Sequence, residues 1–184
     1  MSKGILINLI SGPGVGKSTT AAQLFAALKM KKQQAELVQE NAKQLVWTKN
    51  FETLNNQYQV SHDQYKVFKS IVDEVDFTVT DGSLIHGLAY NITNQNNISN
   101  IDKTKEAILT WFSQFNNFNI FIERRKCSTY DTIGRIESFE EAKIVDNILL
   151  KELDENNIPY LIINIDDIDI ESIAEQLINY KKQL

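Results

Sequence analysis

A glycine-rich stretch near the start of the chain constrains its fold more than any other feature. It follows the apolar run Ile5–Ile10 and precedes an alanine-rich segment that begins at Thr20. Glycines at this spacing let consecutive backbone N–H groups converge on an anion, because no side chain obstructs the approach. The sequence therefore predicts a strand, a phosphate-binding loop and a helix. The loop residues expected to bind a nucleotide are Gly12, Pro13, Gly14, Val15, Gly16, Lys17, Ser18 and Thr19.

The lysine and the hydroxyl that end this loop have separate expected roles. Lys17 should reach the β- and γ-phosphates of a nucleotide, and the Ser18 hydroxyl should bind Mg²⁺. The sequence departs from the pattern G-x-x-x-x-G-K-[ST] at its first position, where Ser11 replaces glycine. A turn that binds no ligand is the alternative. Such a turn, however, does not need a lysine and a hydroxyl directly after its last glycine.

Length and composition fit one globular domain that spans residues 1–184. The chain is 42% hydrophobic and 23% charged, which allows a substantial core. A net charge of −5 argues against a broad basic surface for duplex DNA, because phosphate neutralisation supplies most non-specific affinity. Cys127 is the only cysteine, so neither an intrachain disulfide nor a cysteine-based zinc site can form.

The start of the chain leads directly into the first apolar run and leaves no room for a signal peptide. No apolar run approaches the roughly 20 residues that a membrane-spanning helix needs. We therefore expect a cytoplasmic protein that does not bind membranes, located in the host cytoplasm if the protein is viral.

Short apolar runs alternate with helical patterns along the chain. Strands are expected at residues 5–10, 35–39, 76–80, 119–123 and 160–164. Capping boxes are expected to start helices at Ser61 and Ser138. The remaining helices are expected at residues 20–32, 41–49, 84–92, 103–115 and 170–180. This alternation predicts a three-layer α/β fold with a parallel sheet covered on both faces.

Ligands of such sheets bind at the carboxyl ends of the strands, where two acidic residues stand. Asp81 is expected near the Mg²⁺ bound at Ser18, although it could instead cap the following helix. Glu40 could accept a proton from an attacking hydroxyl or align it. The alternative for Glu40 is a carboxylate that only stabilises a helix N-terminus.

A basic segment and two aromatic residues complete the candidates. Residues 124–137, which carry Arg125 and Arg135, could form a lid over the nucleotide and neutralise charge during transfer. A solvated basic surface is the alternative. Trp47 could stack on a flat acceptor ring, but core or interface packing is the more common role of tryptophan. His62 is expected to be structural or exposed, with acceptor contact as the alternative.

With these residues placed, the chain resembles the small phosphate-loop kinases related to nucleoside and nucleotide kinases. It is especially similar to the short AAA-type ATPase/kinase proteins common in bacteriophage genomes, and also to the kinase domain that phosphorylates nicotinamide riboside. The resemblance covers nearly the whole chain, and only its first segment is specific. The segments that carry it are Ile10–Thr19, Gln39–Lys43, Thr80–Ser83 and Arg125–Arg135.

The resemblance implies a P-loop NTPase fold with sheet order 2-3-1-4-5, ATP with Mg²⁺, and an arginine-bearing lid. In deoxynucleoside kinases, a glutamate that ends strand two is the base, and an acidic-x-Ser sequence ends strand three. Glu40 and Asp81-Gly82-Ser83 occupy similar places, but Gly82 stands where an arginine is often found. No second arginine-finger domain accompanies the chain, so a hexameric motor is not expected.

The function expected from the sequence is ATP-dependent phosphoryl transfer to a nucleoside, a nucleotide or a related small molecule. The expected catalytic residues are Lys17, Glu40, Asp81, Arg125 and Arg135, and the expected Mg²⁺ ligands are Ser18 and Asp81. Two alternatives stay open: a kinase acting on a nucleic-acid end or a modified DNA base, and a P-loop ATPase that works as a switch. A homodimer is compatible with the fold.

Overall fold

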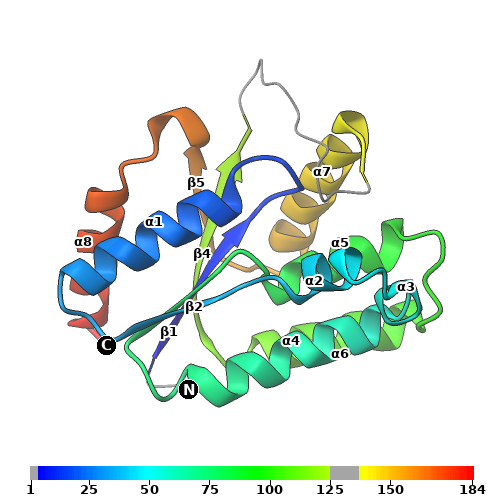
Figure 1. Cartoon of the computed structure of the whole chain (residues 1–184), viewed down its shortest axis with the longest axis horizontal. Helices are drawn as coiled ribbons and strands as arrows, with labels where there is room; N and C mark the ends of the chain where they lie inside the picture. Colours follow the sequence, from blue (N-terminus) through cyan, green and yellow to red (C-terminus); the bar gives the residue numbers. More distant parts are fainter. Residues whose placement is uncertain (1–3, 125–136) are drawn as a thin grey trace.

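Five parallel strands form the centre of the protein, which a computed structural model describes for residues 4–124 and 137–184 (Figure 1). Their order in the sheet is β2-β3-β1-β4-β5. The predicted three-layer fold and the sheet order implied by the resemblance are therefore confirmed. The strands are β1 (Ile5–Ile10), β2 (Ala35–Val38), β3 (Phe77–Thr80), β4 (Asn116–Glu123) and β5 (Leu161–Asn164).

Helices cover both faces of this sheet. Helices α1 and α8 lie together on one face, and the larger group α4 to α7 lies on the other (Figure 1). The helices are α1 (Lys17–Met30), α2 (Asn41–Trp47), α3 (Phe51–Leu54), α4 (Gln57–Ile71), α5 (Leu84–Thr93), α6 (Ile101–Phe112), α7 (Phe139–Glu155) and α8 (Ile170–Lys181), with a 3₁₀ turn at Ile165–Asp167. None of these helices is long and apolar enough to cross a membrane.

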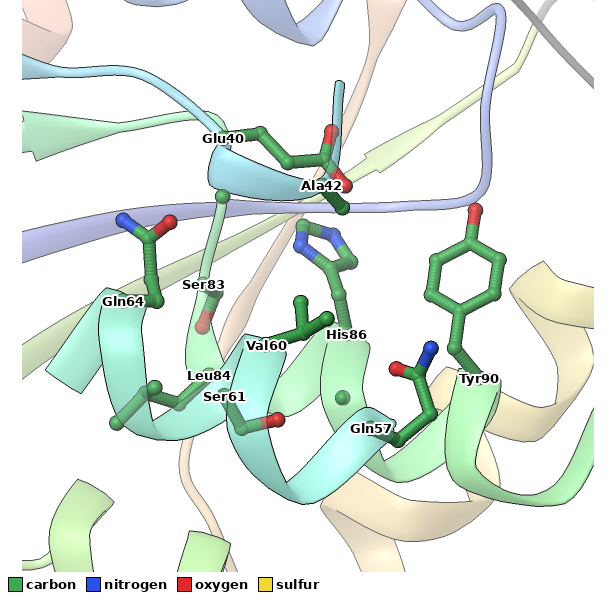
Figure 2. A pocket seen from close by; sticks show the side chains of 12 residues that line it. Glu40, Ala42, Gln57, Val60, Ser61, Gln64, Ser83, Leu84, His86 and Tyr90 are labelled. Atoms are coloured by element: carbon green, nitrogen blue, oxygen red, sulfur yellow. The ribbon is translucent and has the colours of Figure 1, made fainter. Parts of the chain in front are cut away.

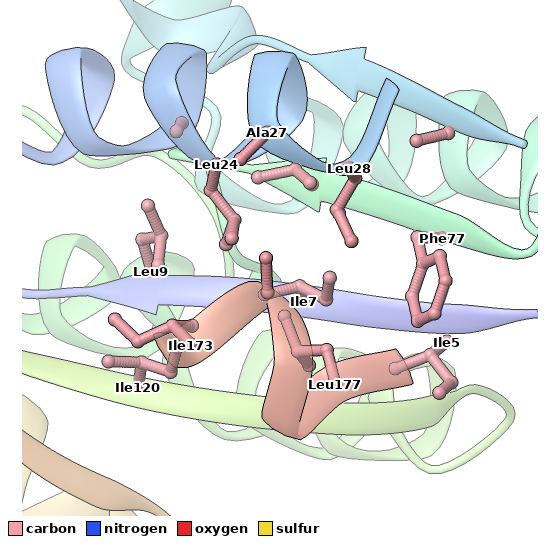
Figure 3. Close-up of a cluster of buried hydrophobic side chains, with 14 of the residues drawn as sticks. Ile5, Ile7, Leu9, Leu24, Ala27, Leu28, Phe77, Ile120, Ile173 and Leu177 are labelled. Atoms are coloured by element: carbon pink, nitrogen blue, oxygen red, sulfur yellow. The ribbon is translucent and has the colours of Figure 1, made fainter. Parts of the chain in front are cut away.

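Strand β1 pairs with β3 and β4 along its two edges, and helices bury both of its faces. Its alternate side chains belong to two separate cores: Ile7 packs in the core beneath α1 and α8, and Leu6 packs in the core beneath the other helices. Figure 3 shows the first of these cores, in which Leu24 of α1 and Leu177 of α8 approach the strands. Continuous apolar character along β1 follows from this double burial.

The predicted start of α4 at a capping box on Ser61 is wrong. The helix begins at Gln57, where the Asn56 side chain caps it by accepting a hydrogen bond from the N–H of Gln59 (3.1 Å). Ser61 is buried one turn further along and packs against α5, where a Cβ on Gly87 would lie 2.4 Å from the Ser61 hydroxyl oxygen. The capping-box pattern requires serine or threonine at the cap, so it does not identify a helix that asparagine caps.

Other differences are small and local. The capping box at Ser138 is present, with the serine and Glu141 bonding each other's backbone N–H groups. The short helix α3 was not predicted, because its four residues are too few to show a period. Strand β4 starts at Asn116, three residues before the predicted start at Asn119, because these polar residues pair with β1.

We expect Leu24→Ala to lower the free energy of unfolding by about 2–5 kcal/mol, because it leaves a cavity in a fully buried site. Met30→Ala in the same helix is the control: its side chain is 82% exposed, so the change should stay within about 0.5 kcal/mol. Urea unfolding of the two variants measures both values. Equal losses would contradict the assigned core.

Candidate functional site

The phosphate loop joins the carboxyl end of β1 to the first turn of α1. Gly16 takes a left-handed backbone conformation (φ 115°) that other residues rarely adopt, and it directly precedes the helix. The loop thus turns sharply, and α1 begins at Lys17 rather than at the predicted Thr20. The positive end of the helix therefore lies at the loop, where a phosphate group would be stabilised.

Lys17 lies folded back over this loop. Its Nζ atom donates hydrogen bonds to the backbone carbonyls of Ser11 (2.8 Å) and Gly12 (2.9 Å), and its side chain is buried. Burial lowers the pKa of Lys17, whereas the carboxylates of Glu40 and Asp81 oppose that shift. Backbone carbonyls carry only partial charge, so a phosphate group would be a stronger partner for this ammonium group.

A hydrogen-bonded chain connects the loop to the ends of the two neighbouring strands. The Ser18 hydroxyl donates to Oδ2 of Asp81, and Oδ1 of Asp81 accepts the backbone N–H of Glu40 at 3.0 Å. Asp81 follows β3 and Glu40 follows β2, so the order of the strands brings these residues together. The cap of α5 is Ser83 rather than Asp81, which leaves the aspartate for contacts at the loop.

Glu40 lies at the N-terminus of α2 and is partly buried. Burial raises the pKa of its carboxyl to about 7, and the negative charges of Asp81 and Glu137 act in the same direction, against the attraction of Lys17. The backbone of Glu40 fits against Gly82, where an added Cβ would lie 2.5 Å from the Glu40 Cα. A side chain at position 82 is therefore excluded, which accounts for the absence of an arginine there.

A cleft of about 540 Å³ opens beside these residues. Trp47 borders it with a side chain that is 60% exposed, so this tryptophan is not part of the core. An exposed indole face on a cleft wall can stack on a flat ring. The lining residues are Ser18, Gln39, Glu40, Asn41, Lys43, Gln44, Trp47, Asp63, Gln64, Val67 and Asp81.

A second, smaller cavity of about 30 Å³ lies beneath Glu40, between α4 and α5. Figure 2 shows the side chains that line it, with the His86 ring pointing toward Glu40 from below. Gln57, Ser61 and Tyr90 also line this cavity. Glu40 therefore borders both hollows, of which only the larger cleft has room for more than a water molecule.

His86 also belongs to this site, although the sequence pattern predicted no role for it. Its Nε2 atom lies 3.4 Å from the backbone N of Ser11, at the start of the phosphate loop. Burial, together with the charge of Lys17, holds the pKa of His86 well below 6.5, so the imidazole is neutral near pH 7. The position of His86 inside a helix does not predict this contact, because the contact depends on how α5 packs against the loop.

His62 lies outside both hollows, in an aromatic cluster. Its ring centroid lies 5.2 Å from that of Trp111, and Tyr58 and Tyr65 stack on either side of it. Neither hollow is lined by His62 or Trp111. The structural role considered for His62 therefore fits the geometry better than contact with an acceptor.

Of the predicted lid, residues 124 and 137 are among those that the structure describes. Arg124 is part of the folded body and forms an ion pair with Asp146 of α7, at 2.6 Å between Nε and Oδ2. No sequence pattern predicted a role for Asp146, because a single carboxylate on an amphipathic helix does not indicate a functional site. Arg125 and Arg135, two of the predicted catalytic residues, lie outside the described residues.

The oxygen atoms of Ser18 and Asp81 are the type of ligand that Mg²⁺ prefers. Within residues 4–124 and 137–184, no three His, Cys, Asp or Glu side chains are grouped as a complete metal site. Mg²⁺ is commonly held by one or two protein ligands together with substrate phosphates and water, so the Ser18–Asp81 contact fits this cation.

The fold and the loop together define a P-loop NTPase. The chain matches the profile of the AAA domain family AAA_28 over residues 6–170, and it therefore belongs to that family. The crystal structure of NadR protein in complex with NAD and AMP-PNP has a similar fold, with a TM-score of 0.71 at 11% sequence identity. The match covers 98% of this chain and 50% of the NadR chain, so this chain spans about half the length of that chain. No curated protein matches the chain.

The raised pKa of Glu40 predicts a pH-dependent stability of the nucleotide-free protein. The carboxyl titrates at about 7 in the folded state and near its ordinary value of 4.5 when unfolded. Between these values the folded protein holds the additional proton. Its free energy of unfolding should therefore fall as pH rises through this window, by on the order of 2 kcal/mol.

Urea unfolding from pH 5 to pH 8 measures this loss. Glu40→Gln cannot titrate at this position, so its free energy of unfolding should not show this decrease as pH rises. Parallel pH profiles for the two proteins would show that Glu40 has an ordinary pKa.

Proposed function

We propose that the protein is an ATP-dependent kinase that phosphorylates a nucleoside, a nucleotide or a related small molecule. The observation that carries this proposal is the position of Glu40. The residue borders both hollows, and its backbone N–H is hydrogen-bonded to the aspartate that contacts Ser18 of the phosphate loop. An ATPase could use such a carboxyl group to orient water, but it would not need an acceptor-sized cleft beside that group.

The nucleotide would bind with its phosphates on the loop. Lys17 would exchange the carbonyls of Ser11 and Gly12 for phosphate oxygens, because charged partners make stronger hydrogen bonds. Ser18 and Asp81 would hold Mg²⁺, which when bound supplies positive charge against the phosphate oxygens. The AMP-PNP in the NadR complex, an ATP analogue on a similar fold, supports this placement.

Glu40 would act on the acceptor. Its ionised carboxyl accepts the proton of an acceptor hydroxyl while the hydroxyl oxygen bonds to the γ-phosphorus and the bond to ADP breaks. A pKa of about 7 leaves a substantial ionised fraction near neutral pH and gives a base of useful strength. If the acceptor is a phosphate oxygen, no proton needs to be removed, and Glu40 would serve in positioning.

The size and the charge of the site favour a small acceptor. The cleft of about 540 Å³ falls within the usual range for small-molecule sites, which is roughly 300–1,000 Å³. Its wall combines the exposed ring of Trp47 with the carboxylates of Glu40, Asp63 and Asp81, and among the described residues that line it only Lys43 is basic. A nucleic-acid strand would meet repulsion from these carboxylates, so the described surface favours the small-molecule alternative.

Transfer of label from γ-labelled ATP to a panel of acceptors tests the proposal. Nucleosides, nucleoside monophosphates, nicotinamide riboside and single-stranded oligonucleotides cover the candidate classes. We expect one of the small molecules to take up label in the presence of Mg²⁺, and Lys17→Ala to abolish transfer. Label that goes only to water would favour a switch ATPase, and label on oligonucleotides alone would favour the polymer-directed kinase.

Glu40→Gln separates the role of the base from that of binding. With a hydroxyl acceptor, we expect kcat to fall by roughly 10²- to 10⁴-fold, because a positioned general base contributes about that factor. The affinity for MgATP, measured by calorimetry, should change little. Asp63→Asn, which changes another carboxylate of the same cleft, is the matched control and should retain most of kcat. Unchanged transfer by Glu40→Gln would remove Glu40 from the role of base.

A further inference from the structure

The phosphate loop is held from outside by two charged residues that the proposed chemistry does not use. Arg124 follows β4, and Asp146 lies on α7. Oδ1 of Asp146 accepts the backbone N–H of Gly12 at 2.5 Å, and Oδ2 accepts Nε of Arg124 at 2.6 Å. Nη2 of Arg124 donates to the carbonyl of Pro13 at 3.0 Å. The Arg124–Asp146 pair thus binds two consecutive loop residues, one through its N–H and one through its carbonyl.

The loop fits closely against this pair. A Cβ on Gly12 would lie 2.4 Å from the carbonyl oxygen of Ala142 and 2.9 Å from Oδ1 of Asp146. Gly12 was expected to clear the approach of a phosphate, but it instead allows the loop to pack on α7. Both side chains of the pair are largely buried, with 10% of Arg124 and 15% of Asp146 exposed. Hydrogen bonds between such charged groups are short and strong, and they are screened little by salt.

The pair also bears on the charge of the loop. The side chains of Arg124 and Asp146 act on the pKa of Lys17 in opposite directions, so each opposes the effect of the other at that ammonium group. Arg124 is also within 5.8 Å of the Phe139 ring, at the first residue of α7. The contacts of the pair to the loop are to the backbone of Gly12 and Pro13, so the pair can fix the backbone of the loop.

From these contacts we infer that Arg124 and Asp146 are positioning residues, which hold the phosphate loop in the shape that binds MgATP. They act on the nucleotide through Gly12 and Pro13 and do not touch the acceptor. The inference rests on the nucleotide binding in the proposed function and does not depend on which acceptor is used. Without the pair, the loop would have to be ordered when the nucleotide binds, at a cost in affinity.

Calorimetric titration of MgATP into the full chain tests this inference. We expect Asp146→Ala to weaken binding by about tenfold or more, as expected for the loss of charge-assisted hydrogen bonds. Asp146→Asn keeps an oxygen that can accept the Gly12 N–H, so it should lose less. Arg124→Gln should weaken binding too. The double variant Arg124→Gln/Asp146→Ala should lose little beyond the larger single effect, because both changes break one network.

Matched controls lie on the same helix. Glu140 and Lys143 form an exposed ion pair at the start of α7, at 2.9 Å, so Glu140→Gln and Lys143→Gln should leave MgATP affinity unchanged. Urea unfolding of every variant without nucleotide shows whether a loss of affinity merely follows a loss of folding. Once an acceptor is known, the KM for ATP should rise while the KM for the acceptor stays the same.

The outcomes separate this inference from the proposed function. Failure of wild type to bind MgATP would overturn the proposed function itself. Binding by wild type and equally tight binding by a folded Asp146→Ala would overturn only the positioning role. Tighter binding by that variant would also overturn it, because Asp146 would then be shown to compete with phosphate. If Asp146→Ala does not fold, Asp146→Asn and Arg124→Gln decide between the same outcomes.

Discussion

The contact between Ser18 and Asp81 is the interaction on which the rest of the site depends. It joins the first turn of α1 to the end of β3, and through the Glu40 N–H it reaches the end of β2. The parallel sheet, with β3 between β1 and β2, places the carboxyl ends of these three strands next to one another. The apolar strands therefore position the site, because their order in the sheet determines which polar residues lie next to one another at the carboxyl ends of the strands.

Two glycines show that the site depends on close backbone packing as well as on charge. Gly82 allows the backbone of Glu40 to approach the segment after β3, and Gly12 allows the loop to rest on α7. Any side chain at either position would separate elements that must stay in contact. The loop is consequently held on both sides, by Asp81 beyond Ser18 and by Asp146 beyond Gly12.

The parts of the structure that could be predicted from sequence depend on local spacing. The loop from Gly12 to Thr19 has a fixed pattern, and apolar runs followed by acidic residues placed Glu40 and Asp81 at strand ends. His86 and Asp146 could not be found in this way, because their contacts to the loop join residues 75 and 134 positions apart. The error at Ser61 has the same origin: its pattern fits a cap, but the packing of α4 against α5 buries it inside a helix.

A structure with Mg²⁺ and a non-hydrolysable ATP analogue tests the central claim most directly. The account predicts phosphates on the loop, with Lys17 Nζ moved from the carbonyls of Ser11 and Gly12 to phosphate oxygens and the metal ion at Ser18 and Asp81. An empty loop, or a nucleotide bound elsewhere while Lys17 keeps its present contacts, would contradict it.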